Sequence, residues 1–336
     1  MNVHPKYGFP ASGSPLHAAV ISVESLDRST AFYRDLLGFD VLDSGRLAGA
    51  AFTTHWSLPS GVTARAALLA DRSCTVGRLL LIEFETSGRE PIRNVPGQCF
   101  FGLVNLNVYV DDIHRLTREL QSAGCEPWSE PVIHDMGAIG TPVEVMIDAP
   151  DTLIINLIEL HVKDPSSRIN LTTSWIADHG GYNRCGATAV ATSQHCVRDY
   201  AGAMAFNTRV LGMSVRNDTV LKGEAMEHFM RYPPGAQTRD TYLQGNHVFG
   251  KIAVNHPLNF ACVDVAARGR APHVGYLAQC FVVADLAAAL AAAADLGCHP
   301  FTPPVSLVLP GLGRVEAALL QNPGSGALHE VIQVTA

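Results

Sequence analysis

The sequence contains an internal repeat, and this repeat constrains the fold more than any other feature. Residues 17–39 and 192–213 both read as a short apolar strand, a turn, an amphipathic helix with an aromatic residue, and a Leu-Gly pair. The spacing from Phe32 to Phe206 equals the spacing from Gly38 to Gly212. Two anchor points with one offset indicate a duplication, in which the same structural unit is built more than once.

A second repeated segment follows each copy of the first. Residues 102–127 resemble residues 275–300, and one constant spacing joins four pairs: Asp112 with Asp285, Cys125 with Cys298, Pro127 with Pro300, and Pro150 with Pro323. The chain therefore consists of four units, which start near residues 16, 102, 190 and 275.

Each unit is predicted to follow a β-α-β-β-β order. In the second unit Asp112 is suited to cap a helix whose apolar residues Ile113, Leu116 and Leu120 recur at helical spacing. Gly124 then ends this helix, and short apolar strands follow between turn residues. One such unit leaves a face of its small sheet uncovered, so the units must pair to bury it.

Composition limits the partners that the chain can have. Its 336 residues are 47% hydrophobic and 16% charged, which is typical of a folded protein large enough for two domains. A net charge of −7 without any basic run excludes nucleic acid as a partner, and no apolar segment is long enough to suggest a membrane helix. Eight cysteines without CxxC pairs, and no signal-like N-terminus, lead us to expect a reducing, cytoplasmic location.

These patterns resemble the vicinal oxygen chelate superfamily, which includes glyoxalases, extradiol dioxygenases, epimerases and bleomycin-binding proteins. The resemblance rests on the apolar strand, the Val-x-Ser/Asp-Leu turn and the AFYRDLLGF segment at residues 31–39, and it extends over roughly residues 16–160 and 190–335. It implies an α+β fold in which four tandem β-α-β-β-β units form two cupped mixed-sheet domains. It also implies a small-molecule substrate and the possibility of a homodimer.

The resemblance divides the chain into two halves of two units each. Residues 162–187 break the repeat, and Trp175 and Tyr182 suggest that this connector packs against a domain. The expected organisation is a tail at 1–15, a first domain at 16–161 with units 16–86 and 100–161, the connector at 162–187, and a second domain at 188–336 with units 190–260 and 274–335.

Members of this family usually hold one divalent metal between the first and last strands of paired units. The family's first-strand ligand lies seven residues before the start of the helix, where this chain has Ala18, Asn105, Thr192 and Ala278. None of these is a common metal ligand, although His17 lies one residue away from the first position. We therefore expect Asn105, Thr192 and the last-strand residue Asn156 to bind substrate.

The last strands supply better candidates for metal ligands. Alignment of the units gives Glu83, His256 and Glu330 at or near the family's carboxylate position, and His195 could join them if its strand carries a bulge. The predicted ligand set is Glu330, His256, His195, Glu83 and His17. Two histidines with one carboxylate suit Fe(II) first, with Mn, Ni or Zn as alternatives.

Three functions follow from the resemblance. The first is metal-dependent ring cleavage of the extradiol type, because four tandem units resemble those dioxygenases most, with His195 and Tyr242 as catalytic residues. The second is a lyase or epimerase that works through an enediolate. The third is a metal-free protein that binds or sequesters a small molecule, which the substituted first-strand positions favour.

Overall fold

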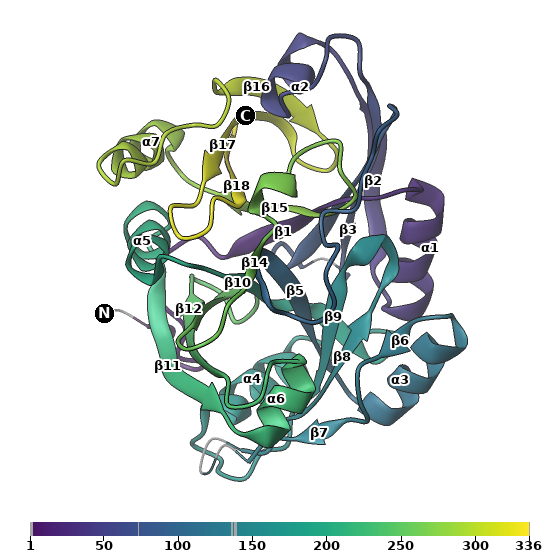
Figure 1. Cartoon of the computed structure of the whole chain (residues 1–336), viewed down its shortest axis with the longest axis vertical. Coiled ribbons are helices and arrows are strands. Elements are labelled where there is room, and N and C mark those ends of the chain that lie inside the picture. The colour runs from purple at the N-terminus through teal and green to yellow at the C-terminus, as the bar shows by residue number, and fades with distance from the viewer. Residues whose placement is uncertain (1–2, 73, 136, 138–139, 336) are drawn as a thin grey trace.

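The computed structural model describes residues 3–72, 74–135, 137 and 140–335 (Figure 1). The first two residues of the expected tail, and the last residue of the second domain, lie outside the described residues. Each unit begins with a long strand that leads into a helix, in the order that the sequence predicts. These pairs are β1 (Leu16–Ser22) with α1 (Leu26–Leu36), β5 (Phe100–Val110) with α3 (Ile113–Ser122), β10 (Ala187–Cys196) with α5 (Tyr200–Ala205), and β15 (Gly275–Val282) with α7 (Leu286–Ala294).

The four helices begin at equivalent residues. Each N-cap has extended backbone angles, and its side-chain oxygen accepts a hydrogen bond from the backbone N–H three residues later. Such a cap satisfies one of the backbone donors that the first helical turn leaves free. The capping residues are Ser25, Asp112, Asp199 and Asp285, which the repeat places at matching positions.

The strands form two mixed sheets. The eight-stranded sheet has the order β16 (Val305–Leu309), β17 (Gly313–Gln321), β18 (Leu328–Val334), β15, β1, β4 (Arg78–Phe84), β3 (Ala64–Ala70), β2 (Asp40–Leu47). The ten-stranded sheet has the order β11 (Ser214–Lys222), β12 (Gln237–Gln244), β13 (Lys251–Pro257), β10, β5, β9 (Ile154–Glu159), β8 (Val143–Asp148), β6 (Glu126–Pro127), with β14 (Val263–Asp264) beside β5 and β7 (Val132–Ile133) beside β8.

We expected the two units of each half to pair with each other. Instead, each unit pairs with a unit of the other half. β1 of the first unit pairs antiparallel with β15 of the fourth, and β5 of the second unit pairs antiparallel with β10 of the third (Figure 1). We call the sheet of the first and fourth units the outer cup, and the sheet of the second and third units the inner cup. In every unit, the first strand has one edge that no strand of its own unit covers. The repeat alone therefore does not determine which two of these edges pair.

One hydrophobic core lies against the capped helices and joins both sheets. It contains Phe32 and Phe206, the aromatic residues of the opening repeat, together with apolar residues of β1, β5, β10 and β15. Gly38 and Gly212 follow the helices at φ +74° and +66°, a backbone conformation that glycine adopts without strain. A Cβ at Gly38 would lie 2.4 Å from the side chain of Asn183, so this turn also requires the absence of a side chain.

The connector is part of the folded structure, as its aromatic residues suggested. Residues 168–178 form α4 (Arg168–Asp178), which starts after the N-cap Ser167. The ring of Trp175 contacts the rings of His247 and Phe249, with centroid distances of 5.1 and 4.8 Å. The connector therefore packs against the third unit. Among the described residues, no helix is both long and apolar enough to cross a membrane.

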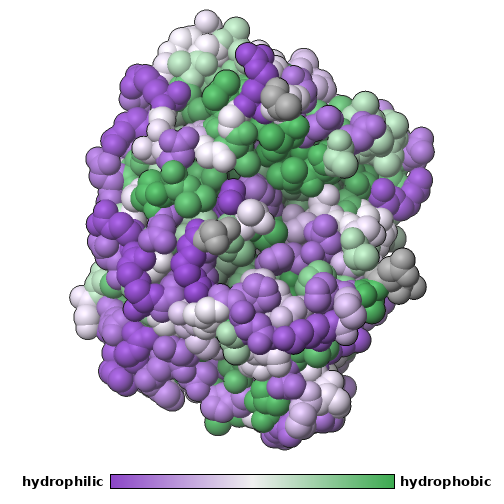
Figure 2. Space-filling model, turned by 180° about the vertical axis from the view of Figure 1, so that it is seen from behind, coloured by the Kyte–Doolittle hydropathy of each residue, from purple (hydrophilic) through white to green (hydrophobic). Residues whose placement is uncertain are grey.

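The outer cup is filled with apolar side chains. The short helix α2 (Ala50–His55) follows β2 and places Phe52 and Trp56 against Phe84 of β4, with ring centroids about 6 Å apart. Seen from behind, the molecule shows hydrophobic residues concentrated in its upper half, where Figure 1 places the outer cup (Figure 2). These buried side chains form one apolar cluster on the concave face of the outer cup.

One polar pair interrupts this apolar filling. Glu330 on β18 and His55 at the end of α2 are both fully buried, and Glu330 Oε1 lies 2.8 Å from His55 Nε2. Glu330 is thus the buried carboxylate that the sequence predicts, but its partner is a histidine that the sequence analysis did not single out. The pair joins α2 to the sheet that it covers.

We predict that His55→Ala destabilises the protein by about 3 kcal/mol, because it leaves the buried carboxyl group of Glu330 without its partner. Urea unfolding followed by circular dichroism measures the loss. The matched control is His114→Ala on the exposed face of α3, which should change the free energy of unfolding by less than about 0.5 kcal/mol. Equal stability of the two variants would show that the pair does not hold α2 in the cup.

Candidate functional site

Glu83 does not face the inside of a cup. Its neighbours Ile82 and Phe84 point into the outer cup, so Glu83 points to the opposite face of β4. There its Oε2 accepts a hydrogen bond of 2.9 Å from the backbone N–H of Leu26, and Arg65 lies 3.4 Å away. Glu83 is therefore a structural residue at the start of α1, and not a metal ligand.

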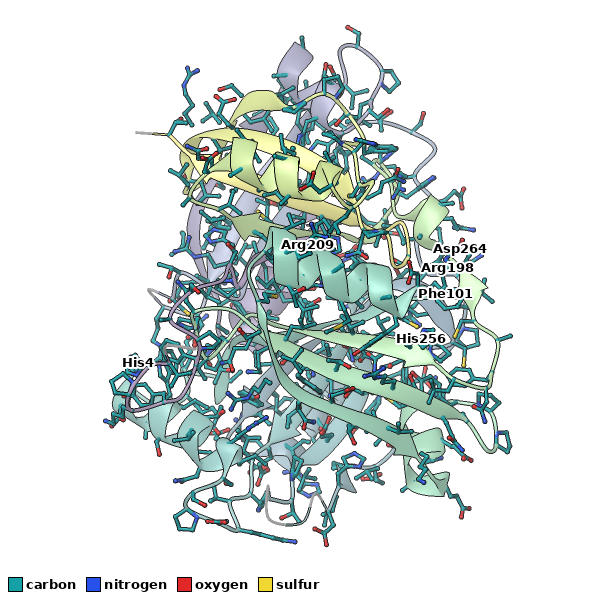
Figure 3. The ribbon with its side chains drawn as sticks, turned by 90° about the vertical axis from the view of Figure 1, so that its left-hand side faces the viewer. His4, Phe101, Arg198, Arg209, His256 and Asp264 are labelled. Carbon is teal, nitrogen blue, oxygen red and sulfur yellow. The ribbon has the colours of Figure 1, made fainter. Side chains whose placement is uncertain are left out.

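His195 and His256 also lie on the wrong face of their strands. His195 is fully buried in the core between the sheets, where its Nε2 lies 2.6 Å from Ser325 Oγ, and burial holds its pKa well below the ordinary value. His256 at the end of β13 bonds through Nδ1 to the carbonyl oxygen of Val197 at 3.1 Å, on the outside of the sheet (Figure 3). Neither residue reaches a cavity, so their predicted metal-binding and catalytic roles are not supported.

His17 lies in the outer cup but is not an exposed donor. A β-bulge between Leu16 and Ala18 accommodates it, and only 8% of its surface is exposed. Burial, together with the nearby Arg78, lowers the pKa of His17 to about 4, so the ring is neutral at physiological pH. The charge of Glu330 raises the pKa of His17, but by less than burial and Arg78 lower it. The five predicted ligands are thus spread over four separate environments.

The inner cup contains an open cavity of about 740 Å³. Three of the predicted site residues meet there: Thr192 on β10, Asn156 on β9 and Tyr242 on β12. Asn105 is fully buried on β5 and does not line the cavity; its amide nitrogen lies 3.4 Å from Met146 Sδ. The connector helix α4 closes one side, since Ile169 and Thr172 also line the cavity.

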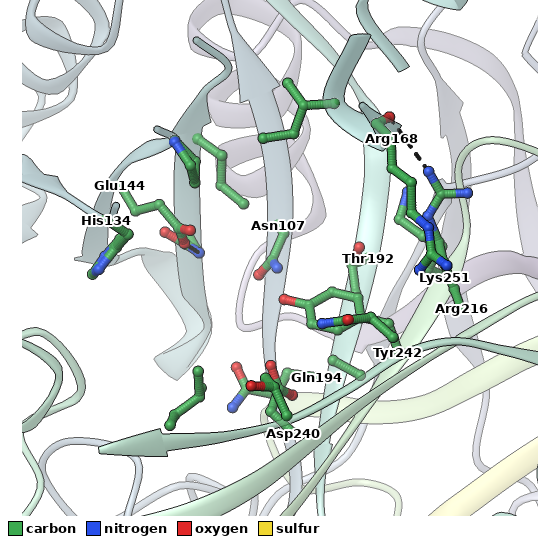
Figure 4. Close-up of a pocket in the computed structure, with 18 of the residues that line it drawn as sticks. Asn107, His134, Glu144, Arg168, Thr192, Gln194, Arg216, Asp240, Tyr242 and Lys251 are labelled. Carbon is green, nitrogen blue, oxygen red and sulfur yellow. Dashed lines mark hydrogen bonds between the residues drawn. The ribbon is translucent and has the colours of Figure 1, made fainter. Parts of the chain in front are cut away.

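Three basic residues line the cavity at one end: Lys251, Arg216 and Arg168, the first residue of α4 (Figure 4). Lys251 begins β13 directly beside Thr192, and its Nζ donates a hydrogen bond of 2.6 Å to the carbonyl oxygen of Val248. Arg216 on β11 donates to Gln244 Oε1 at 2.6 Å and to the carbonyl oxygen of Arg168 at 3.4 Å (Figure 4). Burial lowers the pKa of both groups. The charge of Arg216 lowers the pKa of Lys251 further, and the pKa of Arg216 is raised by Tyr109 and lowered by Arg168 to smaller extents than burial lowers it.

Acidic side chains lie at the other positions of the cavity wall. Asp240 on β12 is buried and accepts a hydrogen bond of 2.9 Å from Asn255 Nδ2; burial, reinforced by the charge of Glu144, raises its pKa to about 7. Glu144 on β8 accepts a bond of 2.7 Å from Asn156 Nδ2, and burial raises its pKa as well. Figure 4 shows Glu144 with His134 on the side opposite Lys251 and Arg216.

Several buried amide oxygens in this cavity have no hydrogen-bond partner among the described residues. They are the side-chain oxygens of Asn107, Asn156 and Asn255. Buried polar atoms are nearly always satisfied, so unsatisfied ones that line a cavity indicate a place for a polar ligand or water.

The charged residues Lys251, Arg216, Asp240 and Glu144 were not among the predicted site residues. A signal existed for Glu144 and Lys251, because each is a charged residue in a mainly apolar strand, whereas Arg216 and Asp240 lie in strands with several polar residues. To use this signal, one must know which face of each strand is concave. Thr192 lines the cavity and therefore identifies the concave face of β10. Lys251 is its partner on β13, so it lies on the concave face as well.

The residues present offer few donors for a divalent metal. In the inner cup, Asn107 on β5 lies beside Asn156 on β9, and Thr192 on β10 lies beside Lys251 on β13. Amide and hydroxyl groups are weak ligands for Fe(II), Ni or Zn. In the outer cup Ala18 and Ala278 supply no donor, and Glu330 already bonds to His55. Among the described residues, no three His, Cys, Asp or Glu side chains are arranged to bind a metal. The residues therefore do not fit the family's metal.

Comparisons with known proteins agree with the fold. Residues 15–157 match the model of the glyoxalase/bleomycin resistance protein/dioxygenase superfamily, and no curated protein matches the chain in sequence. A variant of glyoxalase I from Zea mays is 16% identical with a TM-score of 0.61, covering 96% of this chain and 93% of its own. A proposed dioxygenase from Bacillus subtilis is 9% identical with a TM-score of 0.57, and the match covers 97% of this chain and 87% of the dioxygenase. Proteins of this superfamily are generally metal-dependent enzymes. Over residues 15–157 the chain matches the glyoxalase/bleomycin resistance protein/dioxygenase superfamily, and over its whole length it has the fold of these solved structures.

Proposed function

We propose that the inner cup binds a small molecule with an anionic oxygen group, without a metal ion. The observation that supports this proposal is the pair Lys251 and Arg216 at one end of the cavity. In the part of the chain that the structure describes, neither forms an ion pair with a carboxylate. A basic group withdrawn from water and left without a counter-ion is costly, and an anionic ligand removes this cost.

The geometry of the two basic groups suits a carboxylate or a comparable oxyanion. The guanidinium of Arg216 offers several N–H donors in one plane, which matches the two oxygens of a carboxylate. At the other end, Asp240 and Glu144 have raised pKa values and can be protonated, so they can donate a hydrogen bond to a neutral polar group. The expected ligand therefore has an anionic end and an uncharged polar end.

This proposal favours the third predicted function, a metal-free site, over the first two. Ring cleavage of the extradiol type and a metal-stabilised enediolate both need a ligand set that neither cup provides. The resemblance to glyoxalase I and to the proposed dioxygenase concerns the fold, and fold does not determine activity.

One observation favours a second candidate function, an enzyme that transfers protons. The pKa of Asp240 is about 7, which is close to the value at which a general base works best at neutral pH. In this case Lys251 and Arg216 would stabilise an oxyanion that develops on the substrate, and Asp240 would hold the transferred proton. Binding at the same end of the cavity is common to both candidates.

We predict that Arg216→Met weakens the binding of phenyllactate, a small carboxylate, about 10- to 100-fold, because it removes a charge-assisted hydrogen bond. Isothermal titration calorimetry measures the dissociation constant. The matched control is Arg239→Met on β12, where the arginine is exposed and paired with Asp218 at 2.6 Å; this variant should bind as tightly as the wild type.

The same titration tests the absence of a metal. Binding of phenyllactate should be equal before and after treatment with a chelator. A loss of binding after chelation would contradict a metal-independent site, and equal binding by the Arg216 variant would contradict its location.

We predict that Asp240→Asn reduces the pH dependence of stability between about pH 4 and pH 7. The folded-state pKa of Asp240 is about 7 and its ordinary value is 3.8, so the wild type is stabilised below pH 4 and loses this contribution as pH rises through 7, by up to about 4 kcal/mol. The asparagine cannot ionise and avoids the loss. Urea unfolding at both ends of this range measures the difference.

Asp218→Asn serves as the control for this experiment. Asp218 bonds to Arg239, and this bond lowers its pKa, so its contribution has the opposite sign and is lost only as pH falls through the lowered pKa. This variant should therefore keep the wild-type decline between pH 4 and pH 7. An unchanged decline in the Asp240 variant would show that its carboxyl group ionises normally in the folded protein.

A further inference from the structure

Lys251 has the surroundings of a reactive amine. Only 4% of its surface is exposed, its side chain enters the cavity of the inner cup, and its Nζ makes one hydrogen bond, to the carbonyl oxygen of Val248. The ring of Tyr109 lies below it, with the centroid 5.5 Å from Nζ. A carboxylate partner, which would keep the ammonium form, is absent from its described surroundings.

The other three lysines of the chain have no such environment. Lys6, Lys163 and Lys222 are all exposed, and two of them form ion pairs, with Asp178 and Asp135. Lys251 instead lies near the cation of Arg216, and together with burial this neighbour lowers its pKa well below the ordinary value. A lysine that is desolvated and placed beside another cation holds a neutral amine, which is nucleophilic.

We propose that Lys251 forms a Schiff base with the carbonyl carbon of a small 2-oxo carboxylate whose carboxylate group is bound by Arg216. This inference rests on the proposed function, because Arg216 supplies the anionic end of the same site. In a 2-oxo carboxylate the carbonyl carbon is directly bonded to the carboxylate carbon. A ligand held through its carboxylate by Arg216 therefore presents its carbonyl to a neighbouring amine, and Figure 4 shows the two side chains next to each other.

The reaction needs no oxidant and no further reactant. The Nζ lone pair attacks the carbonyl carbon, a C–N bond forms, and the oxygen gains a proton to give a carbinolamine. The nitrogen then loses two protons. One of them replaces the proton at the group that protonated the oxygen, and the hydroxyl group takes up the other and leaves as water, so that a neutral C=N bond remains. Tyr242, which lines the same cavity and whose pKa burial holds well above the ordinary value, is neutral and can donate a proton to the carbonyl oxygen.

The remainder of the ligand extends toward the acidic side of the cavity. Asp240 and Glu144 lie there with the unsatisfied oxygens of Asn156 and Asn255. These groups can bind a hydroxyl or amide substituent through hydrogen bonds. The cavity of about 740 Å³ is large enough for a ligand with an aromatic or branched side chain.

Reductive trapping tests this proposal on the intact protein. Phenylpyruvate and sodium cyanoborohydride are added at neutral pH, and the reduced adduct is located by intact mass and peptide mapping. We expect one adduct per chain, on Lys251, formed at least 10 times faster than on Lys6, Lys163 or Lys222. Arg216→Met should slow the labelling of Lys251 at least 10-fold, since it removes the group that binds the carboxylate.

Lys251→Met should abolish the adduct while leaving some binding of phenyllactate, which lacks the carbonyl. A second variant, Lys251→Arg, keeps a basic group at this position and should also form no adduct. Circular dichroism of both variants shows whether they are folded. Wild-type protein labelled evenly on all four lysines, or not at all, overturns the Schiff base. If phenyllactate still binds in that case, the proposed function stands; if neither compound binds, the proposed function fails as well.

Discussion

The antiparallel pairing of β5 with β10 is the contact on which the inner cup depends. It joins the second unit to the third and places Asn107 opposite Thr192 in the middle of the sheet. The parallel neighbours β9 and β13 then bring Asn156 and Lys251 to the same level. These four polar groups take their relative positions from this register. A shift by one residue would turn each of these side chains to the other face of the sheet.

The two cups have the same strand plan but different interiors. In the outer cup, Phe52 of α2 and the following Trp56 pack on the concave face, and the buried carboxylate of Glu330 bonds to a histidine. In the inner cup, the corresponding space stays open, and the connector helix α4 covers one side of it. The difference arises mainly from the segments inserted between strands, since the strands themselves follow one repeat. Chemistry in this protein is thus expected in one cup only.

Much of the fold could be predicted from the sequence, because the repeat and the helix caps are local features. Ser25, Asp112, Asp199 and Asp285 begin their helices where the spacing places them. The pairing of units could not be predicted, since four equivalent strand edges leave the choice to long-range packing. Of the predicted site residues, Thr192, Asn156 and Tyr242 line the cavity of the inner cup, and their roles stay predictions. His195, His256 and Glu83 failed because the face of a strand depends on register, which a single sequence does not determine.

The pairing across the halves also has a consequence for the history of the chain. The first half contacts the second through two equivalent seams, β1 with β15 and β5 with β10, which is the arrangement of a symmetric dimer of half-length chains. In such a dimer every substitution appears in both cups at once, so the two sites must stay alike. Fusion into one polypeptide removes that restriction. One cup could then become a permanently closed scaffold, while the other acquired a lysine and an arginine that its twin never had to accommodate.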